Sequence, residues 1–322
     1  MVCQIVYTQN NITNIGKGNN QLVYSFPNSV SFPNHEVSIS NISLYYSWVN
    51  IDSNTLNNNT FYYLWEQAGD AGLLSFPVVI PNGLYEIATI NYYLQYTMIQ
   101  NGHYLVDTAT GNNVYFIEMV VNPSNYTVQI NTYPIPAISG TTPPTGYTLG
   151  TGWTYNGTGF IPTVCMSNPN LIAGVPTAPH TYTNFYKIVG YDPAFTSNSN
   201  TYTIATTTAN KSSNSSTAPQ VQPNPTIFFA ISNIDNKYSN PSTIVFQLSP
   251  TVAFGELITI TPPQFAFNKL IPGTYNGIRL AILGTNFQPL TIIDPEITIT
   301  MVIRDRKDIS LTDALATATG GK

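Results

Sequence analysis

The chain has 322 residues, of which 43% are hydrophobic and only 8% are charged, and its formal net charge is −5. This length allows one large all-β domain, or a smaller domain with an added one. No Lys or Arg stands between Lys17 and Lys187. More than half of the chain therefore offers no cation to phosphate groups, and no specific nucleic-acid site is expected. Charge keeps protein surfaces apart, so this composition favours burial in an assembly or the uncharged coat of a secreted β-protein.

The two cysteines, Cys3 and Cys165, are too few for a disulfide framework and have no metal-ligand spacing, which favours reduced, buried thiols. The N-terminal VCQIVYTQNN has no charged region before an apolar core, so no signal peptide is expected. No apolar run is long enough to cross a bilayer, so no membrane span is expected.

Residues 84–101 are predicted to form the only long helix. Apolar residues three and four positions apart give it one apolar face: Ile87, Ile90, Leu94 and Met98. Glu86 places a negative charge in the first turn, and Asn101-Gly102 suits a helix C-terminus because Gly accepts a left-handed conformation. Two strand-like runs, 114–121 and 126–132, follow as a predicted hairpin.

The rest of the chain is predicted to consist of short strands separated by turns. Before the helix they cover 21–26, 36–49, 61–65 and 76–80, and a change of alternation near Asn41-Ile42 indicates a bulge or a bend. After Thr226 they cover 227–231, 242–248, 257–260, 278–283 and 297–303. Several short strands that follow one another at intervals of roughly 8 to 12 residues, with turns between them, indicate a β-sandwich or jelly roll.

Residues 133–225, rich in Pro, Thr, Ser, Gly, Asn and Tyr, are predicted to be an insertion, because a loop of this length inside a compact domain is improbable. Its expected parts are a small core around Trp153 and Phe160, strands at 185–189 and 201–206, and a mobile tract near 210–221; compositional disorder is the alternative for its second half. The predicted fold is all-β: a single jelly-roll β-sandwich with one helix (about 84–101) and an inserted partly β domain. Residues 1–132 and 226–322 form the two parts of the roll.

Two blocks of sequence resemble one known family. In the first, Ile80-Pro81 precedes Gly83 and Tyr85, and 91–95, 101–103, 115–118 and Asn122-Pro123 follow in order. In the second, 254–305, the patterns P-x-F-x-F-N and P-L-x-I-I-D-P-x-I stand at 263–268 and 289–297. Both resemble the minor capsid, or penton, protein of virophages and Polinton-type viruses. They cover less than half of the chain, and their motifs serve packing and turns, not chemistry.

The resemblance implies a structural virion protein that is not an enzyme: a homopentamer at the fivefold vertices of an icosahedral capsid, made in the host cell cytoplasm. Its neighbours would be the trimeric major capsid proteins, and the insertion would reach outward, where it could contact a host receptor. Five copies in a ring bury a heterologous interface on both flanks of each subunit. Few charges and many tyrosines suit such buried surfaces.

The sequence predicts no catalytic, cofactor-binding or metal-ligating residue. The three histidines, His35, His103 and His180, lie in no metal spacing, and His103 is expected to bond backbone carbonyls after the helix. Glu66 and Asp70 could face each other across a turn, but no pattern assigns them the separation of glycosidase carboxylates.

Two further groups are interpreted structurally. Asp294 before Pro295 is expected to form a corner between strands and to bond nearby backbone. Arg304, Arg306 and Lys307 form the only basic cluster, interpreted as a solvated strand end or as a face toward the capsid interior or a neighbouring subunit.

The alternative function is a jelly-roll carbohydrate- or receptor-binding spike or lectin module. Its candidates for stacking on sugars are the three tryptophans, Trp48, Trp65 and Trp153. Strand placement assigns the first two to the core, which leaves Trp153 as the predicted ligand platform. A β-sandwich hydrolase is the least supported reading, because no acid/base constellation is visible.

Overall fold

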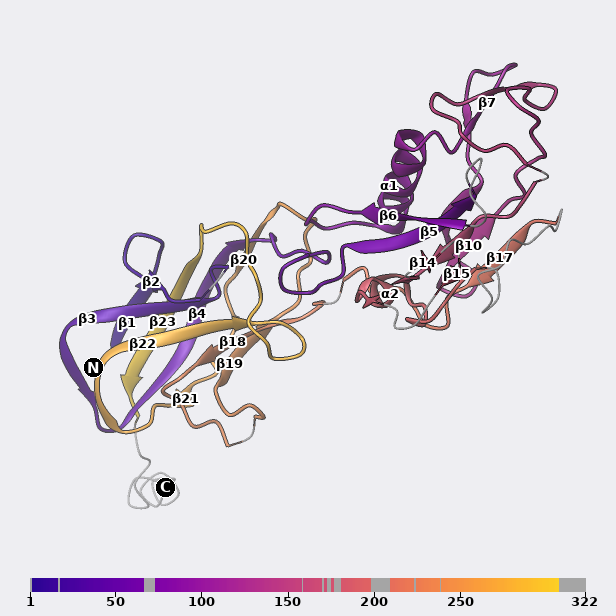
Figure 1. The fold of residues 1–322 in the computed structure, drawn as a ribbon. Helices are drawn as coiled ribbons and strands as arrows, with labels where there is room; N and C mark the ends of the chain where they lie inside the picture. Colours follow the sequence, from indigo (N-terminus) through magenta and orange to yellow (C-terminus); the bar gives the residue numbers. More distant parts are fainter. Residues whose placement is uncertain are drawn as a thin grey trace, which may run out of the picture. The chain divides into compact units, whose positions relative to one another are not determined.

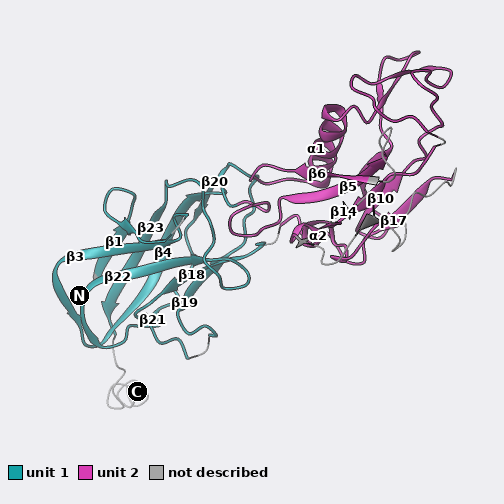
Figure 2. Cartoon of the chain, viewed as in Figure 1, with its two compact units in different colours: residues 1–48, 224–322 teal, residues 49–223 magenta. Residues whose placement is uncertain are grey.

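The computed structural model describes residues 2–16, 18–66, 73–157, 159–169, 171–172, 175–176, 181–197, 209–222, 224–237 and 239–306. The chain forms two compact units (Figures 1 and 2). Unit 1 comprises Met1–Trp48 and Asn224–Lys322, and unit 2 comprises Val49–Pro223. Both units are mostly β, and the described residues contain two helices.

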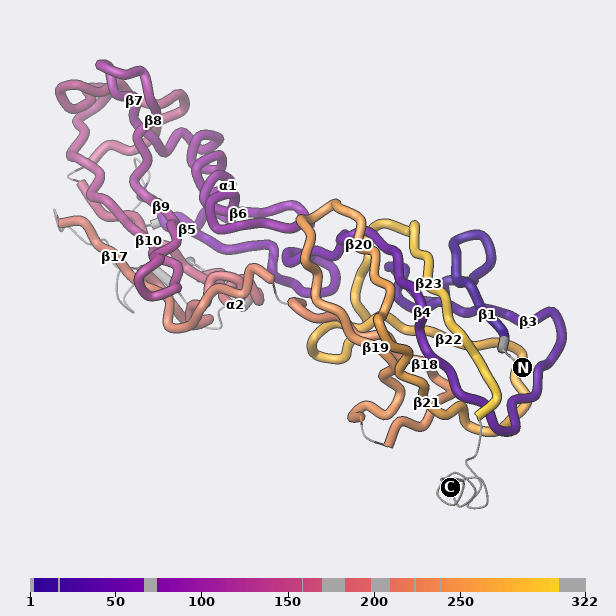
Figure 3. The backbone as a smooth tube through the Cα atoms, turned by 180° about the vertical axis from the view of Figure 1, so that it is seen from behind, coloured from indigo at the N-terminus to yellow at the C-terminus, as the bar shows by residue number. Residues whose placement is uncertain are grey.

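Unit 1 contains two sheets. The first has the order β1 (Val2–Tyr7), β23 (Thr298–Asp305), β4 (His35–Tyr45) and β20 (Leu257–Ile260), with β21 (Asn268–Lys269) also on β4. The second has the order β19 (Ile244–Leu248), β18 (Ile227–Ile231), β22 (Gly273–Leu283), β3 (Gln21–Phe32) and β2 (Thr13–Asn14). Figure 3 shows β23 running alongside β4 in the first sheet.

The sheet order identifies the fold of unit 1. Leaving aside the two-residue strands β2 and β21, the strands of the first sheet are first, eighth, third and sixth along the chain, and those of the second are second, seventh, fourth and fifth. All of their pairings are antiparallel. Two Greek keys wrapped into facing sheets give this arrangement, which is the jelly roll. The prediction of a single jelly roll is confirmed, and unit 2 is inserted between its third and fourth strands.

The predicted bulge in β4 sets the register of the first sheet. Thr300 pairs with Asn41 but Met301 pairs with Ile39, so Ser40 is the extra residue. An extra residue reverses the faces of all later side chains. Val37 and Ile39 before it and Ile42 and Leu44 after it are therefore all buried in the core.

Unit 2 contains several small sheets. Their elements are β5 (Thr60–Glu66), β6 (Leu73–Val79), β7 (Leu105–Asp107), β8 (Asn113–Val114), β9 (Ile117–Asn122), β10 (Thr127–Thr132), β11 (Tyr147–Leu149), β12 (Thr163–Cys165), β13 (Ser167–Asn168), β14 (Leu171–Ile172), β15 (Val175–Pro176), β16 (Thr181–Tyr182) and β17 (Lys211–Asn214). The sheets are β12-β5-β6, β17-β10-β9, β11-β7-β8, β13-β16 and β14-β15.

The predicted helix is α1 (Ile87–Gln100), and its buried residues are the four predicted apolar positions. Asn91 Oδ1 accepts a 2.8 Å hydrogen bond from the backbone N–H of Met119, so α1 is fixed against β9. Gly102 follows the helix with φ +71°, and a Cβ there would lie 2.4 Å from the backbone of Gly152. A glycine is therefore required where the helix ends.

The predicted domain boundary at 132/133 does not coincide with the division of the chain, because unit 2 already begins at Val49. One hydrophobic cluster joins residues on both sides of 133, including Trp65, Ile90, Ile130, Phe160 and Phe185. The strands and helix at 60–132 thus fold with the insertion. The other predicted boundary, 225/226, lies close to the observed one at Pro223.

Several local predictions were wrong. Residues 185–189, predicted as a strand, form α2 (Phe185–Val189), which ends at Gly190 with φ +76°. The tract at 210–221, predicted to be mobile, contains β17, and Ser215 and Gln220 bond the backbone of Val128 and Ile188. The strand predicted at 21–26 does not end there but continues to Phe32. The predicted strand at 201–206 lies outside the described residues.

Candidate functional site: an apolar sheet edge and a basic pocket

One edge of the first sheet of unit 1 is unusually apolar. The chain from β20 to β21 runs along the outer side of β4, first beside 42–45 and then beside 36–37. Eight large apolar side chains of unit 1 are exposed among the described residues, and four of them belong to this segment: Phe254, Leu257, Phe265 and Ile271. We call this segment, 254–271, the apolar edge.

The apolar edge is suited to side-chain contacts with a partner. Leu257 is 46% exposed and Phe265 is 48% exposed. Lys269 and Glu256 are its only charged residues, and Pro262-Pro263 interrupt it. Proline has no backbone N–H to donate to a neighbouring strand, so it hinders the pairing of this edge with a further strand. A partner would therefore bury these side chains without extending the sheet.

Beside the apolar edge lies a pocket of about 530 Å³. Its charged lining residues are Glu36 on β4, Asp235 and Lys237 in the loop after β18, Lys269 on β21 and Arg306 after β23. Phe267 and Ile271 form part of its apolar wall. We call this cavity the basic pocket, because three cations face two carboxylates.

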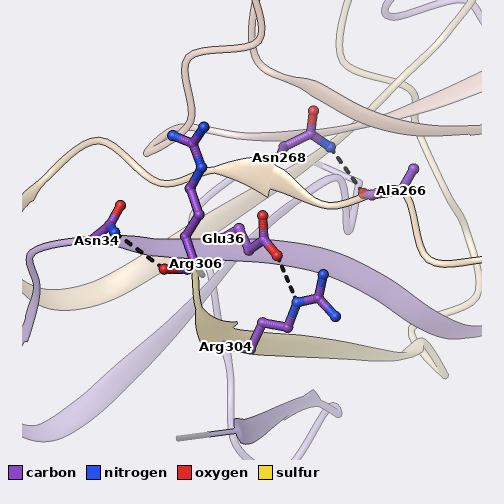
Figure 4. A network of polar contacts seen from close by, with 6 residues as sticks. All are labelled: Asn34, Glu36, Ala266, Asn268, Arg304 and Arg306. Atoms are coloured by element: carbon purple, nitrogen blue, oxygen red, sulfur yellow. Dashed lines mark hydrogen bonds and ion pairs between the residues drawn. The ribbon is translucent and has the colours of Figure 1, made fainter. Parts of the chain in front are cut away.

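An ordered group of polar contacts holds one side of the basic pocket (Figure 4). Arg304 Nε lies 2.6 Å from Glu36 Oε1, and its guanidinium carbon lies 3.5 Å from the centroid of the Phe267 ring. Figure 4 shows Arg304 pointing to Glu36, whereas Arg306 extends in a different direction. The Nδ2 of Asn34 donates a 3.2 Å hydrogen bond to the backbone carbonyl of Arg306. Arg304 thus neutralises Glu36.

The charges of the chain are unevenly divided. Unit 2 contains seven acids and two lysines, and so accounts for the whole net charge of −5, whereas unit 1 contains eight residues of each sign. Four cations of unit 1 lie in or beside the basic pocket: Lys237, Lys269, Arg304 and Arg306. Lys307, the remaining member of the predicted basic cluster, lies outside the described residues.

Unit 2 presents a hydrogen-bonded polar surface on the sheet β17-β10-β9. Asn131 Oδ1 accepts bonds of 2.7 Å from Gln129 and from Ser212, and its Nδ2 donates to Glu118 at 3.2 Å. Asn122 Nδ2 donates to Gln129 and to Asn214. We call these six residues the polar face: Glu118, Asn122, Gln129, Asn131, Ser212 and Asn214.

The predicted candidate residues occupy mainly structural positions. His35 Nε2 lies 3.0 Å from Asp305 Oδ1, and Asp294 Oδ1 accepts a bond from the N–H of Glu296, as predicted for a corner. Burial raises the pKa of Glu66. Its proposed companion Asp70, like His180, lies outside the described residues. Among the residues that the structure describes, no three His, Cys, Asp or Glu side chains gather as a metal site would require.

The tryptophans belong to the two cores. Trp48 and Trp65 are buried, as predicted. Trp153 is half-buried: its Nε1 donates to the Tyr155 carbonyl at 2.8 Å, and its ring packs edge-on against Trp65. Trp153 is therefore not the exposed flat platform that the sequence predicted. Cys165 is buried as expected, but Cys3 is exposed.

His103 lies inside the core of unit 2. It is fully buried, stacks on Trp65 with ring centroids 4.2 Å apart, and its Nδ1 lies 2.9 Å from the Tyr63 hydroxyl. The predicted bonding to backbone carbonyls was wrong, because the partner is a side chain. Burial lowers the pKa of His103 to about 3.

This burial predicts a pH-dependent stability for unit 2. Below the ordinary histidine pKa the unfolded chain binds a proton that folded His103 does not, so acid favours unfolding down to about pH 3. We expect His103 alone to cost about 2 kcal/mol between pH 7 and pH 5. Urea unfolding at a series of pH values measures this. In His103→Gln the free energy of unfolding is expected to lose the part of its pH dependence that His103 causes, whereas His35→Gln is expected to retain that part. An equal pH dependence in the wild type and both variants would contradict the assignment to His103.

Among the described residues, no helix is long and apolar enough to span a bilayer. No family model and no curated protein matches the sequence. Among solved structures, the chain is similar to the mavirus penton protein, with 8% identity, a TM-score of 0.39 and coverage of 94% of this chain and 98% of that chain. It is also similar to a chain in the structure of the Sputnik virophage, with 11% identity, a TM-score of 0.33 and coverage of 97% and 99%. Because both TM-scores are low, the assignment of the fold rests on the sheet order of unit 1.

Proposed function

We propose that this chain is a structural virion protein, a penton that forms homopentamers at the fivefold vertices of an icosahedral capsid. The observation that carries the proposal is a jelly roll with an apolar, proline-interrupted edge. Jelly rolls recur in viral capsid and lectin domains. The two sequence blocks that resemble virophage penton proteins support the capsid reading over the lectin reading.

The apolar edge gives the ring a physical basis. A ring of identical subunits uses a heterologous contact, in which one flank of a copy packs against the other flank of the next. Phe254, Leu257 and Phe265 supply one such flank. These side chains are each 44–48% exposed, so burying the remaining surface of one contributes about 1 kcal/mol, and a ring repeats the contact five times. An isolated monomer would leave this surface in water.

The remaining roles follow from the same proposal. The protein acts in the virion by closing the shell at its fivefold points, beside the trimeric major capsid proteins, and needs no catalytic residue for this. Its low charge suits a surface that assembly covers, since charged residues are depleted at interface cores.

Negative-stain electron microscopy of the purified chain tests this proposal. We expect ring-shaped particles whose class averages have fivefold symmetry. Rings of another symmetry, or single subunits both alone and with the major capsid protein, would contradict the proposal.

A second candidate function, attachment to a host receptor through unit 2, is favoured by the polar face. Asparagine is unfavourable in strands, yet three neighbouring strands each place one there: Asn122, Asn131 and Asn214. Their lateral bonds hold the amides in fixed orientations, and amides that both donate and accept suit the hydroxyl groups of a neutral carbohydrate.

A glycan array probed with the intact chain tests this second function. We expect binding that falls at least about tenfold in Gln129→Ala/Asn131→Ala, which amounts to about 1.4 kcal/mol. Asn112→Ala, an exposed asparagine elsewhere in unit 2, is the matched control. No binding by the intact chain, or equal binding by both variants, would contradict a carbohydrate role.

A further inference from the structure

The basic pocket is concave and charged, and it lies at the end of the apolar edge around Phe267 and Ile271, whereas the ring contact is proposed for Phe254, Leu257 and Phe265. We propose that it binds an acidic peptide segment supplied by another protein, with carboxylates near Lys237 and Lys269 and an apolar side chain against Phe267 and Ile271. Its volume of about 530 Å³ lies in the range of ligand pockets.

The first argument is the balance of charge in the pocket. Of its two carboxylates, Glu36 is already engaged by Arg304. Arg304 is itself held over the Phe267 ring, at 3.5 Å, so it stays on Glu36. Neither Lys237 nor Lys269 forms an ion pair with a described residue. The pocket therefore offers more cationic than anionic groups to a ligand, and its potential favours a carboxylate.

The second argument is the shape and the mixture of lining groups. A nucleic acid is bound by many cations along a phosphate backbone. Here the cations are few, Asp235 stands among them, and unit 1 as a whole has equal numbers of acids and bases. The exposed Ile271 and the ring of Phe267 add an apolar wall. A peptide with adjacent acidic and apolar side chains would place its carboxylates against the cationic lining and its apolar side chain against the apolar lining.

The third argument concerns this chain's own described acids as donors of the segment. Most of them are engaged in their own turns or strands, as the bonds of Asp52, Asp107, Glu118 and Asp192 show. One exposed acidic corner is 293–296, between β22 and β23. Within unit 1 the pocket lies at the opposite end of these two strands, where β22 begins and β23 ends. The described acids therefore favour another protein as the donor of the segment.

Fluorescence anisotropy with a labelled hexapeptide, DDFELD, tests the inference on the intact chain. We expect saturable binding that weakens with salt, since the contact is electrostatic. Lys237→Gln/Lys269→Gln is expected to weaken it at least about tenfold, the loss of two charge-assisted contacts. The control Lys187→Gln/Lys211→Gln removes two cations of unit 2 and is expected to change affinity less than about twofold.

Three results would overturn the inference. One is equal binding of the amide peptide NNFQLN, which has the same shape without the carboxylates. Another is tighter binding of a single-stranded DNA oligonucleotide that is lost in the same double variant, which would make the pocket a nucleic-acid site. The third is loss of the oligomer in the double variant, which would assign the pocket to the ring. Peptide binding does not require pentamers, so the pocket and the proposed function can fail separately.

Discussion

Replacing Trp65 with alanine is expected to remove a large share of the folding free energy of unit 2 and to lower its melting temperature strongly. Trp65 is fully buried on β5, where it stacks on His103 and packs against Phe160 and Phe116 at centroid distances of 5.2 and 6.1 Å. Truncating a buried tryptophan costs about 3–5 kcal/mol, because it removes apolar contacts and leaves a cavity. A domain is stable by only about 5–15 kcal/mol. Thermal and urea denaturation followed by circular dichroism measure the loss.

Tyr92→Ala is the control for this prediction. Tyr92 lies on α1 in the same unit and is 62% exposed, so its removal is expected to change stability by less than about 0.5 kcal/mol. Equal losses in the two variants would show that the stacked aromatic core does not hold unit 2 together.

Leu257→Asp/Phe265→Asp is expected to abolish the pentamer and leave a folded monomer. Both side chains are about half exposed on the apolar edge, so aspartate is tolerated in the free subunit. In the ring each substitution would bury an unpaired carboxylate, which costs several kcal/mol and exceeds what one apolar contact contributes. Sedimentation velocity measures the mass, and the melting temperature checks the fold.

Tyr126→Asp is the matched control for the ring. Tyr126 is 68% exposed at the turn between β9 and β10, and it belongs to unit 2, whereas the apolar edge belongs to unit 1. We expect this variant to remain pentameric. A pentamer that survives the double substitution would exclude the apolar edge as the ring contact.

The sequence predicts the jelly roll well because its strands carry local signals. Alternating apolar residues locate β4 and β23, a continuous apolar run locates β18, and the phase change near Asn41 locates the bulge. The three-and-four spacing of α1 identifies its buried face. Such patterns depend only on which side of an element meets the core, so they can be read without the fold.

The division of the chain could not be found in this way. Strands β5 and β6 of unit 2 are short, mainly apolar runs like several strands of the roll, and the change of composition at Tyr133 falls inside one shared core. For α2, the five residues FYKIV are too short a segment to distinguish a strand from a helix. The signal that distinguishes them is the buried spacing of Phe185, Ile188 and Val189 before Gly190.

The candidate surfaces were missed because they combine distant residues. The basic pocket joins Glu36, Lys237, Lys269 and Arg306. The pairing of β4 with β21 and β23 places three of them, and the bridge from Ile234 to Leu270 places the loop of Lys237. The polar face likewise depends on the pairing of β10 with β17, in which Asn131 and Ser212 are 81 residues apart. The clustering of Arg304 and Arg306 was visible in the sequence, but their partners were not.

The central claim, a homopentamer, is tested most directly by the mass of the purified chain in solution. Light scattering after size exclusion, over a range of salt and protein concentration, measures it. The account predicts a species of five times 35.3 kDa that persists at high salt, because the apolar edge carries little charge. A species of 35.3 kDa at every concentration, with the major capsid protein present as well as absent, would contradict it.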